Sequence, residues 1–365
     1  MKILFDYLIF FHQKYGGISR YFLNLQEQFL KKNIETKIFA PIHKNINLKN
    51  NQDNQLFNIY LKNYPMFTRK ILKTFNHYSS KIYYNFYKPK IVHKTFYEKN
   101  ISNDKCKRII TVYDLIHEIY YKDYNKEKNF KPKKNALNNI DKIICISKKT
   151  KEDLLSFYDI DEKKIEVIYL GIQKFPGYDE KNITIYKKPF LLYVGDRLKY
   201  KNFSNLINAF SISTKLQKDF DIVCCGGGKI TDTEKKFILN LKIDISKIKQ
   251  IDASDEQLSY LYKHASALIY PSKYEGFGLP TLEAMSLGCP VISSKHSAII
   301  ETVGDAAKTF NPEDHEDIKF CIEELVYSTE QINNFKIQDS FVNINIFKYE
   351  NIHFINILFL LFIEI

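Results

Sequence analysis

Several common features are absent from the 365-residue sequence, and each absence excludes a class of protein. The six cysteines form no CxxC pair and no zinc-type spacing with histidine, which indicates reduced, buried thiols and a cytosolic protein. A membrane span needs about 20 apolar residues, whereas the apolar run Ile357–Ile363 has seven. The first residues, MKILFDYLIFF, lack a small-residue cleavage site and therefore indicate a buried strand rather than a signal peptide.

Acidic residues are scarce in the first part of the chain. Residues 1–150 contain 29 Lys and Arg against 11 Asp and Glu, a balance of +18, whereas the remaining 215 residues contain 25 against 31, or −6. A merely lysine-rich composition would spread evenly, so this distribution predicts an anionic partner: a membrane surface, a phosphorylated lipid or nucleic acid. Because no DNA- or RNA-binding motif accompanies it, we expect a peripheral contact with an anionic membrane surface and no nucleic acid.

Short apolar, β-branched runs alternate with longer amphipathic stretches, which predicts an α/β fold of parallel sheets with helices on both faces. The expected strands are Lys2–Phe5, Thr36–Phe39, Ile91–His93, Arg108–Val112, Lys142–Ile146, Ile165–Tyr169, Phe190–Val194, Ile222–Cys225, Ala267–Tyr270 and Pro290–Ser293. The expected helices are Ile18–Lys32, Lys149–Phe157, Asn205–Leu216, Asp255–His264 and Thr281–Leu287. The Asn-rich segment Lys44–Asn63 is expected to be a loop.

A polar segment with glycine and proline, at about 171–189, precedes a fresh apolar strand and marks a domain boundary. The chain length suits two domains of about 150–180 residues each. Open α/β sheets bind ligands beyond the carboxyl ends of their strands, so a cleft between two such domains would hold the site. The expected parts are a Rossmann-like domain over 1–172, a linker over 173–189, a second Rossmann-like domain over 190–330 and a tail over 331–365.

Glycines and cations follow two of the expected strands. Gly16 and Gly17 open a helix after the first strand, where backbone N–H groups and the helix dipole favour a phosphate or sugar; a plain turn is the equal alternative. Gly195, Arg197 and Lys201 follow the strand FLLYV. Two cations there would clamp a diphosphate, arginine by its fork and lysine as a point charge, although a solvated basic loop explains them as well.

Two further groups carry weaker signals. Asp114 and His117, in TVYDLIHE, follow the strand Arg108–Val112 and would position a sugar hydroxyl or accept a proton; a structural role is the alternative. The glycines 226–228 end the strand IVCC, where a flexible turn is simpler than a close approach to a ligand.

The segment PSKYEGFGLPTLE is more specific. Gly276 and Gly278 allow an unusual loop, and Pro280 suits the first position of the helix that follows. The helix N-terminus would supply donors to a phosphate. Glu283, expected in the first turn, would accept hydrogen bonds from a ribose, which leaves Glu275 to face the sugar. An acidic first turn that only stabilises the helix explains Glu283 but not the GFG loop.

These motifs resemble the retaining glycosyltransferases of family 4, which have the GT-B fold. PSKYEGFGLPTLEAMSLGCPVI, with two glutamates separated by seven residues, resembles their donor-site signature. The resemblance covers roughly residues 1–315 and includes, in the family's order, MKILFDYLIFFHQKYGGISRYF, TVYDLIHE, ISKKTKEDL, VGDRLKYKN and LYKHASALIYPS.

The resemblance implies transfer of a sugar from a UDP- or GDP-sugar to a lipid-linked or polysaccharide acceptor, with retained anomeric configuration. Arg197 and Lys201 would neutralise the donor diphosphate, and no DxD-type pair is present for a metal, so neither metal nor cofactor is expected. Glu283 would bind the ribose and Glu275 the transferred sugar.

The resemblance also implies roles for less reactive groups. Backbone N–H groups of Gly276, Phe277, Gly278 and Leu279 would face the donor phosphate and sugar. By the same likeness, Gly16, Gly17 and Gly195 would shape the phosphate site, and Asp114 and His117 would meet the donor sugar or the acceptor. Many relatives carry a histidine directly before the aspartate, where this chain has Tyr113.

The end of the sequence departs from the family. Ser340–Ile365 does not resemble the closing helices of relatives, which often carry a tryptophan, and this chain has none. Two hypotheses stay open: an enzyme of cell-surface glycan synthesis (lipopolysaccharide, O-antigen or capsule) at the cytosolic membrane face, and a non-catalytic sugar-nucleotide-binding remnant. A third hypothesis is a sugar-nucleotide epimerase on the same fold, and the motif EGFGLPTLE argues against it.

Overall fold

The computed structural model describes residues 1–51, 58–97, 106–120, 130–172, 175–183, 186, 188–197 and 199–328. They form two units: the first contains Met1–Ile146 and Thr150–Ile168, and the second contains Ser147–Lys149 and the described residues from Tyr169 onward. The predicted tail at 331–365, with the runs Ser340–Ile365 and Ile357–Ile363, lies outside the described residues. The predicted domain bounds stay predictions.

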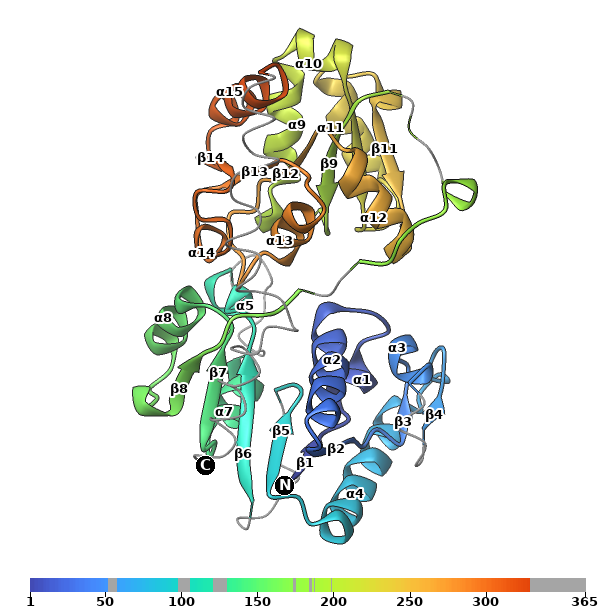
Figure 1. Ribbon diagram of the computed structural model, residues 1–365, viewed down its shortest axis with the longest axis vertical. Helices are drawn as coiled ribbons and strands as arrows, with labels where there is room; N and C mark the ends of the chain where they lie inside the picture. The colour runs from blue at the N-terminus through green and yellow to red at the C-terminus, as the bar shows by residue number, and fades with distance from the viewer. Residues whose placement is uncertain are drawn as a thin grey trace. The chain divides into compact units, whose positions relative to one another are not determined.

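The first unit is built on a six-stranded parallel sheet in the order β2-β1-β5-β6-β7-β8 (Figure 1). The winding reverses between β1 and β5, and such a switch point is where open α/β sheets bind ligands. The central strands are buried on both faces, as parallel strands covered by helices are. The strands are β1 (Lys2–Phe5), β2 (Glu35–Ile38), β5 (Ile91–Lys94), β6 (Lys107–Val112), β7 (Lys142–Cys145) and β8 (Ile165–Val167).

Helices pack on this sheet through apolar stripes. In α2 (Gly17–Lys31), Phe22, Leu25 and Phe29 recur at helical spacing and are buried. The Phe22 ring meets Phe5 of β1 at 5.1 Å between centroids, so α2 covers the sheet beside the switch point. The other helices are α1 (Leu8–His12), α3 (Ile46–Lys49), α4 (Arg69–Tyr87), α5 (Ile116–Ile119), α7 (Phe130–Leu137) and α8 (Lys148–Phe157).

The expectation of a loop over Lys44–Asn63 is wrong in part. This region contains α3 and also β4 (Ile59–Tyr60), which pairs in parallel with β3 (Ile42–His43). The Asn45 side chain accepts a hydrogen bond from the backbone N–H of Leu48 at 2.9 Å and caps α3. An asparagine that reads as a loop residue thus begins a helix here.

The second unit has a six-stranded parallel sheet in the order β11-β10-β9-β12-β13-β14. Its switch point lies between β9 and β12. The strands are β9 (Phe190–Val194), β10 (Asp221–Cys225), β11 (Ile248–Ile251), β12 (Ala267–Tyr270), β13 (Val291–Ser294) and β14 (Lys308–Phe310). The helices are α9 (Phe203–Ser211), α10 (Thr214–Asp219), α11 (Asp232–Asn240), α12 (Asp255–His264), α13 (Leu279–Ser286), α14 (Ile299–Val303) and α15 (His315–Val326).

The expected α/β fold of two parallel-sheet domains is confirmed. Every expected strand is present with its ends shifted by at most two residues. The single helix expected over Asn205–Leu216 is wrong: it is two helices, because the Ser213 hydroxyl accepts from the Leu216 N–H at 3.1 Å and starts α10. The strands and α-helices that were not expected are β3, β4, β11, β14, α1, α3, α4, α5, α7, α11, α14 and α15.

All six cysteines are buried, which confirms the expected burial, and none is in a disulfide in the structure. Within the described ranges, no group of three or more His, Cys, Asp or Glu residues could hold a metal ion. Among those same residues, no helix has the length and hydropathy of a membrane span.

Asp6 follows β1 and lies buried at the switch point of the first sheet. Its Oδ1 accepts hydrogen bonds from the backbone N–H groups of Leu8 (3.1 Å) and Thr95 (3.2 Å) and from the Thr95 hydroxyl. Burial raises the pKa of Asp6 to about 6, even though these hydrogen bonds and nearby Lys94 lower it. An ionised carboxylate at this position is therefore costly in the folded protein.

We expect Asp6→Asn to stabilise the protein at neutral pH. The carboxyl pKa rises from 3.8 to about 6 on folding. Protonation of Asp6 therefore stabilises the folded state fully below about pH 4, and this stabilisation is lost as the pH rises through about 6. Asparagine keeps an acceptor and removes the charge, so the gain should be roughly 2 kcal/mol at about pH 7.5 and close to nothing at about pH 4. Urea unfolding measures both values. Asp159→Asn, at an exposed position, is the control, and a gain of equal size at both pH values would contradict the prediction.

Candidate functional site

The predicted motifs of the second unit lie at the switch point of its sheet. The segment with Gly195, Arg197 and Lys201 follows β9, and the loop with Glu275 follows β12. These two strands are hydrogen-bonded neighbours, on either side of the point where the strand order reverses. Residues about 70 positions apart in the sequence are therefore brought to one edge of the sheet.

Lys201 and Glu275 form the centre of this edge. The Lys201 Nζ lies 2.6 Å from the Glu275 Oε1, and the two side chains are only 15% and 10% exposed. The ammonium group also lies near the rings of Tyr200 and Tyr270, 5.4 and 5.8 Å from their centroids. Burial raises the pKa of Tyr270 well above its usual value, and the neighbouring Glu275 carboxylate raises it further. The pair is thus a shielded, oriented charge pair.

The loop that carries Glu275 is fixed through its backbone. The Ser297 hydroxyl accepts a hydrogen bond from the Glu275 N–H (3.2 Å) and donates one to the Glu275 carbonyl (2.6 Å). Gly278 has φ +103°, a conformation that favours glycine, and a Cβ there would come within 3.4 Å of the Thr302 hydroxyl. Phe277 is buried at this turn. The GFG sequence therefore builds a specific loop shape.

The helix after this loop starts earlier than expected. Gly278 is the N-cap of α13, so Leu279 takes the first helical position and Pro280 the second. Glu283 consequently lies in the second turn, and its expected place in the first turn is wrong. Its Oε2 accepts a hydrogen bond from the Tyr262 hydroxyl of α12 at 3.0 Å. Its binding of a ribose stays a prediction.

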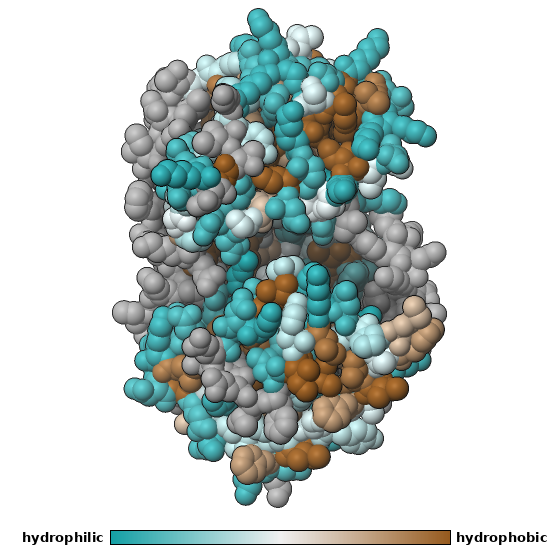
Figure 2. All heavy atoms as spheres, turned by 90° about the vertical axis from the view of Figure 1, so that its right-hand side faces the viewer, coloured by the Kyte–Doolittle hydropathy of each residue, from teal (hydrophilic) through white to brown (hydrophobic). Residues whose placement is uncertain are grey.

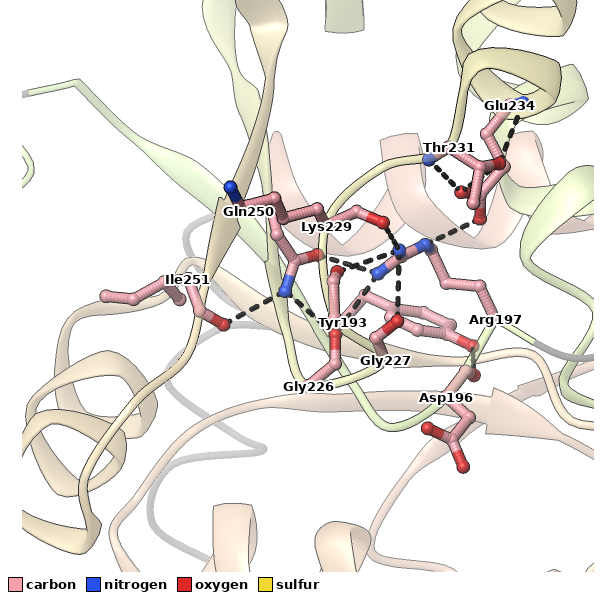
Figure 3. A network of polar contacts seen from close by, with 11 residues as sticks. Tyr193, Asp196, Arg197, Gly226, Gly227, Lys229, Thr231, Glu234, Gln250 and Ile251 are labelled. Carbon is pink, nitrogen blue, oxygen red and sulfur yellow. Dashed lines mark hydrogen bonds and ion pairs between the residues drawn. The ribbon is translucent and has the colours of Figure 1, made fainter.

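Arg197 is the residue whose environment differs most from the expectation (Figure 3). Its Nε lies 2.7 Å from Glu234 Oε1, and its Nη1 donates to Gln250 Oε1 (2.7 Å) and to the Gly226 carbonyl (3.1 Å). Its Nη2 donates to three backbone carbonyls, those of Gly227, Gly228 and Lys229. The side chain is 3% exposed. Because all five N–H donors of a guanidinium are engaged, a diphosphate could reach Arg197 only if these contacts opened.

The same network holds the glycine loop after β10. All three glycines at 226–228 have left-handed φ angles, and a Cβ on Gly227 would lie 2.9 Å from the Arg197 Nη1. Gln250 of β11 donates to the Gly226 carbonyl at 2.8 Å, and Glu234 closes a capping box with Thr231 at the start of α11. The flexible turn expected here is instead a loop closed around a buried guanidinium.

In the first unit, Gly16 and Gly17 begin α2, as expected. The side-chain oxygen of Gln13 accepts from the backbone N–H of Ser19 at 3.2 Å, so one donor of this helix N-terminus is already bound within the chain. The Tyr21 ring of α2 meets the Tyr113 ring after β6 at 5.9 Å. The glycine turn and the Asp114 segment therefore lie near one another at the carboxyl edge of the sheet.

A buried ion pair supports the Asp114 segment and was not predicted. The Lys133 Nζ lies 2.8 Å from Glu118 Oε1 and donates to the Asp114 carbonyl at 3.0 Å, and the Tyr158 hydroxyl donates to Glu118 at 2.7 Å. The Asp114 Oδ1 accepts from the Ile116 N–H at 3.1 Å. Nothing in TVYDLIHE distinguishes a buried glutamate from an exposed one, and its partner comes 15 residues later in the chain, so the sequence offered no signal.

The predicted residues thus form two groups, one in each unit. His117 is exposed on α5 beside Asp114. The remaining site predictions stay predictions. The first-unit group is Gly16, Gly17, Asp114 and His117, and the second-unit group is Gly195, Arg197, Lys201, Glu275, Gly276, Phe277, Gly278, Leu279 and Glu283.

Two family models match the chain in succession. "Glycosyltransferase Family 4" matches residues 15–174, and "Glycosyl transferases group 1" matches residues 178–338. Among curated proteins, the O-antigen chain mannosyltransferase RfbU of Salmonella typhimurium is 29% identical over 241 residues, which are 64% of this chain and 66% of that protein. The O-antigen chain mannosyltransferase B of Escherichia coli is 34% identical over 127 residues, 34% of this chain and 33% of that one. The chain therefore spans about two thirds or less of these relatives.

Solved structures share the fold across the whole chain at low identity. The sucrose-phosphate synthase of Thermosynechococcus elongatus has a TM-score of 0.77 at 17% identity, and both chains are covered in full. The lipopolysaccharide outer core galactosyltransferase WaaB has 0.68 at 18%, again with both chains covered in full. Anabaena HepE, solved with UDP and glucose, has 0.68 at 13% with the same coverage. This likeness confirms the expected GT-B fold. With both halves matched by family models in the order that the motifs predicted, the chain belongs to glycosyltransferase family 4.

Proposed function

We propose that this chain transfers a sugar from a UDP- or GDP-sugar to a glycan or glycolipid acceptor of cell-surface polysaccharide synthesis, with retention of the anomeric configuration. The observation that carries the proposal is the shielded Lys201–Glu275 pair at the switch point of the second sheet. The O-antigen mannosyltransferases among the relatives support the acceptor class. The UDP complex of Anabaena HepE supports the donor class.

Charge stabilisation at the leaving group is the main chemistry that these residues offer. When the bond to the sugar breaks, the departing nucleoside diphosphate gains negative charge, and Lys201 would neutralise it. Glu275 holds the ammonium group in place at 2.6 Å and would contact the sugar. Backbone N–H groups from Phe277 to Leu279, at the start of α13, would add donors to the phosphates. Glu283 would accept from the ribose.

In the first unit, Asp114 and His117 would position the donor sugar or the acceptor. Lys133 donates a hydrogen bond to the Asp114 carbonyl and so holds the backbone that carries this carboxylate in place. The excess of cations over residues 1–150 favours an acceptor at an anionic membrane surface, with the protein acting on the cytosolic face.

A second candidate, a sugar-nucleotide-binding protein without turnover, is favoured by Arg197. If its guanidinium keeps the contacts of Figure 3, only one of the two predicted cations is available to the diphosphate. Binding of a nucleotide sugar would persist, whereas charge stabilisation in the transition state would be weaker.

Donor hydrolysis by the purified chain separates the two candidates. With a panel of UDP- and GDP-sugars, we expect slow release of UDP or GDP from one donor and a rise in melting temperature with that same donor. NMR of the released or transferred sugar should show the donor's anomeric configuration. A melting shift with no release from any donor, with and without membrane extract as acceptor source, would support the non-catalytic candidate and contradict the enzyme.

A further inference from the structure

Helix α4 presents an apolar stripe to solvent. Its most exposed large side chains recur every three or four residues and therefore share one face of the helix. Phe86 is 83% exposed and Ile82 is 73% exposed, values unusual for apolar residues in a regular helix. Figure 2 shows brown, hydrophobic side chains at the surface of the first unit. The stripe consists of Phe67, just before the helix, and Ile71, Phe75, Tyr78, Ile82 and Phe86.

The opposite face of α4 holds the helix on the unit through aromatic and polar side chains, and Tyr84 and Tyr87 belong to a buried apolar cluster of the unit. The Asn76 side chain accepts from the Ile42 N–H (3.0 Å) and donates to the Ile42 carbonyl (2.8 Å). Tyr83 stacks on Phe39 with 4.1 Å between ring centroids. Tyr87 donates to the Glu35 carbonyl at 3.3 Å. Since these contacts fix the rotation of the helix, the apolar stripe cannot turn inward without breaking them.

This arrangement inverts the usual pattern of a surface helix. A helix of a water-soluble domain buries its most apolar side chains and exposes its polar ones. In α4 the buried positions are two polar residues, Asn76 and Ser80, and two tyrosines, whereas isoleucine and phenylalanine side chains face outward. Contiguous exposed apolar surface of this kind marks an interaction site.

The segment that carries the stripe has basic residues and no acidic ones; the acidic neighbour Glu35 of β2 lies near Tyr83 and Tyr87 on the other face of α4. Residues 58–97 contain eight Lys and Arg and no Asp or Glu. Lys70, Lys81 and Lys88 are exposed on or directly after α4. Lysine is depleted at protein–protein interfaces, whereas apolar side chains edged by lysine suit a bilayer, with the chains among the acyl groups and the cations at anionic headgroups. The charge therefore favours lipid over a second copy of this chain.

We propose that α4 is a membrane-docking helix that lies in the interface of an anionic bilayer with its apolar stripe inserted. The helix has 19 residues and thus a length of about 28 Å, enough to lie along the membrane plane for five turns. The α4 surface would thus be the part of the basic first unit that contacts the anionic membrane. Membrane docking adds to the proposed sugar transfer without resting on it, because vesicle binding needs no donor.

The lack of tryptophan in this chain allows a clean reporter. In Phe86→Trp the only indole lies on the stripe, and in Phe320→Trp it lies on α15 of the second unit, at a position that is 59% exposed. With vesicles of phosphatidylcholine and phosphatidylglycerol, we expect the emission of Phe86→Trp to shift to the blue and that of Phe320→Trp to stay unchanged. An unchanged emission of Phe86→Trp in the presence of bound vesicles would overturn the proposal.

Sedimentation with the same vesicles tests the stripe itself. Replacing Phe75, Ile82 and Phe86 together by serine should weaken binding by roughly tenfold or more. The matched control replaces Phe157, Leu239 and Phe320 by serine; these side chains are exposed singly on α8, α11 and α15. Equal binding by the stripe variant and the wild type would contradict the proposal. A concentration-dependent dimer that the stripe variant loses, without vesicle binding by the wild type, would assign the stripe to a second copy.

The cations are tested by charge and salt. Replacing Lys70, Lys81 and Lys88 by glutamine should weaken binding roughly fivefold for each charge, and added salt should weaken wild-type binding. Replacing Lys218, Lys236 and Lys242, which are exposed in the second unit, is the control. Binding that is the same on pure phosphatidylcholine and at high salt would exclude the anionic lipid. Donor hydrolysis in detergent is measured on each variant, so that a loss of membrane binding is distinguished from a loss of sugar transfer.

Discussion

Lys201→Ala is expected to lower the turnover of nucleotide-sugar cleavage by roughly a hundredfold to a thousandfold, the usual effect of removing one charge-stabilising donor from an active site. Lys201 is held by Glu275 at the carboxyl edge of β9 and β12, shielded from solvent. Because the charge on the leaving diphosphate develops in the transition state, kcat should fall more than the affinity for the donor. Release of UDP or GDP at saturating donor measures kcat, and a melting shift with donor measures binding.

Lys199→Ala is the matched control for this variant. Lys199 lies two positions earlier in the same 3-10 turn and is exposed, so its removal deletes the same charge from the same element. We expect its kcat to stay within a few-fold of wild type, because exposed charges act weakly through water. Glu275→Gln keeps the shape of the side chain and removes the partner charge, and its kcat should fall as well. Equal losses in Lys199→Ala and Lys201→Ala would refute a specific role for Lys201.

Arg197→Met should destabilise the second unit by about 3 kcal/mol, the low end for breaking a buried ion pair from one side. Methionine fills much of the same space, but Glu234, Gln250 and the glycine-loop carbonyls lose their common donor. At roughly 2–4 °C per kcal/mol for a domain of this size, the melting temperature should fall by about 6–12 °C. Calorimetry, which resolves the unfolding of separate units, measures the loss.

The loss should depend on pH in a defined direction. Desolvation acts to raise the pKa of Glu234, but the hydrogen bonds from Arg197 and Thr231 outweigh it and hold the pKa below the usual value. A depressed carboxyl pKa stabilises the fold above the unfolded value of about 4.5 and stops doing so as the pH falls through the folded value. The difference between wild type and Arg197→Met should therefore shrink in acid.

Lys235→Ala is the control for Arg197→Met, because Lys235 lies on α11, the helix that carries Glu234. Lys235 pairs with Asp232 at 3.2 Å, but both side chains are exposed, so the loss should stay within about 1 kcal/mol. If instead Arg197→Met melts like the wild type while its affinity for the donor falls, the network of Figure 3 is not what holds the loop. Arg197 would then act as the diphosphate ligand that the family resemblance implies.

The strands and the places of the motifs were predictable because they rest on local signals. A buried parallel strand is a short apolar run, and a motif that follows such a run must lie at the carboxyl edge of the sheet. For this reason the motifs of Lys201 and Glu275 could be assigned to strand ends of the second domain, and the family resemblance implied that they share one site. Strand β14, with the sequence KTF, has one apolar residue in three and therefore forms no apolar run in the sequence.

Helix α4 shows how such reasoning fails. Apolar side chains recur every three or four residues in α4, which is the sequence signal of an amphipathic helix and predicts that this face is buried. In the structure this face is exposed, while Asn76, Ser80, Tyr84 and Tyr87 face inward. The excess of basic charge over residues 1–150 was visible in the sequence, but the surface that concentrates it was not.

The sequence by itself determined the α/β alternation, the family and the edge of each sheet at which the polar residues gather, since all of these depend on the order and spacing of residues. Tertiary structure alone decided which charges meet. Lys201 pairs with Glu275, Lys133 pairs with Glu118, and Arg197 binds a glutamate and a ring of carbonyls in place of solvent. A side chain's partners depend on distances between segments remote in the chain, and the energy of a charge depends on burial. No local pattern encodes either quantity. Arg197, which the sequence assigned to a phosphate, is therefore found buried and bound to the carbonyls of the glycine loop.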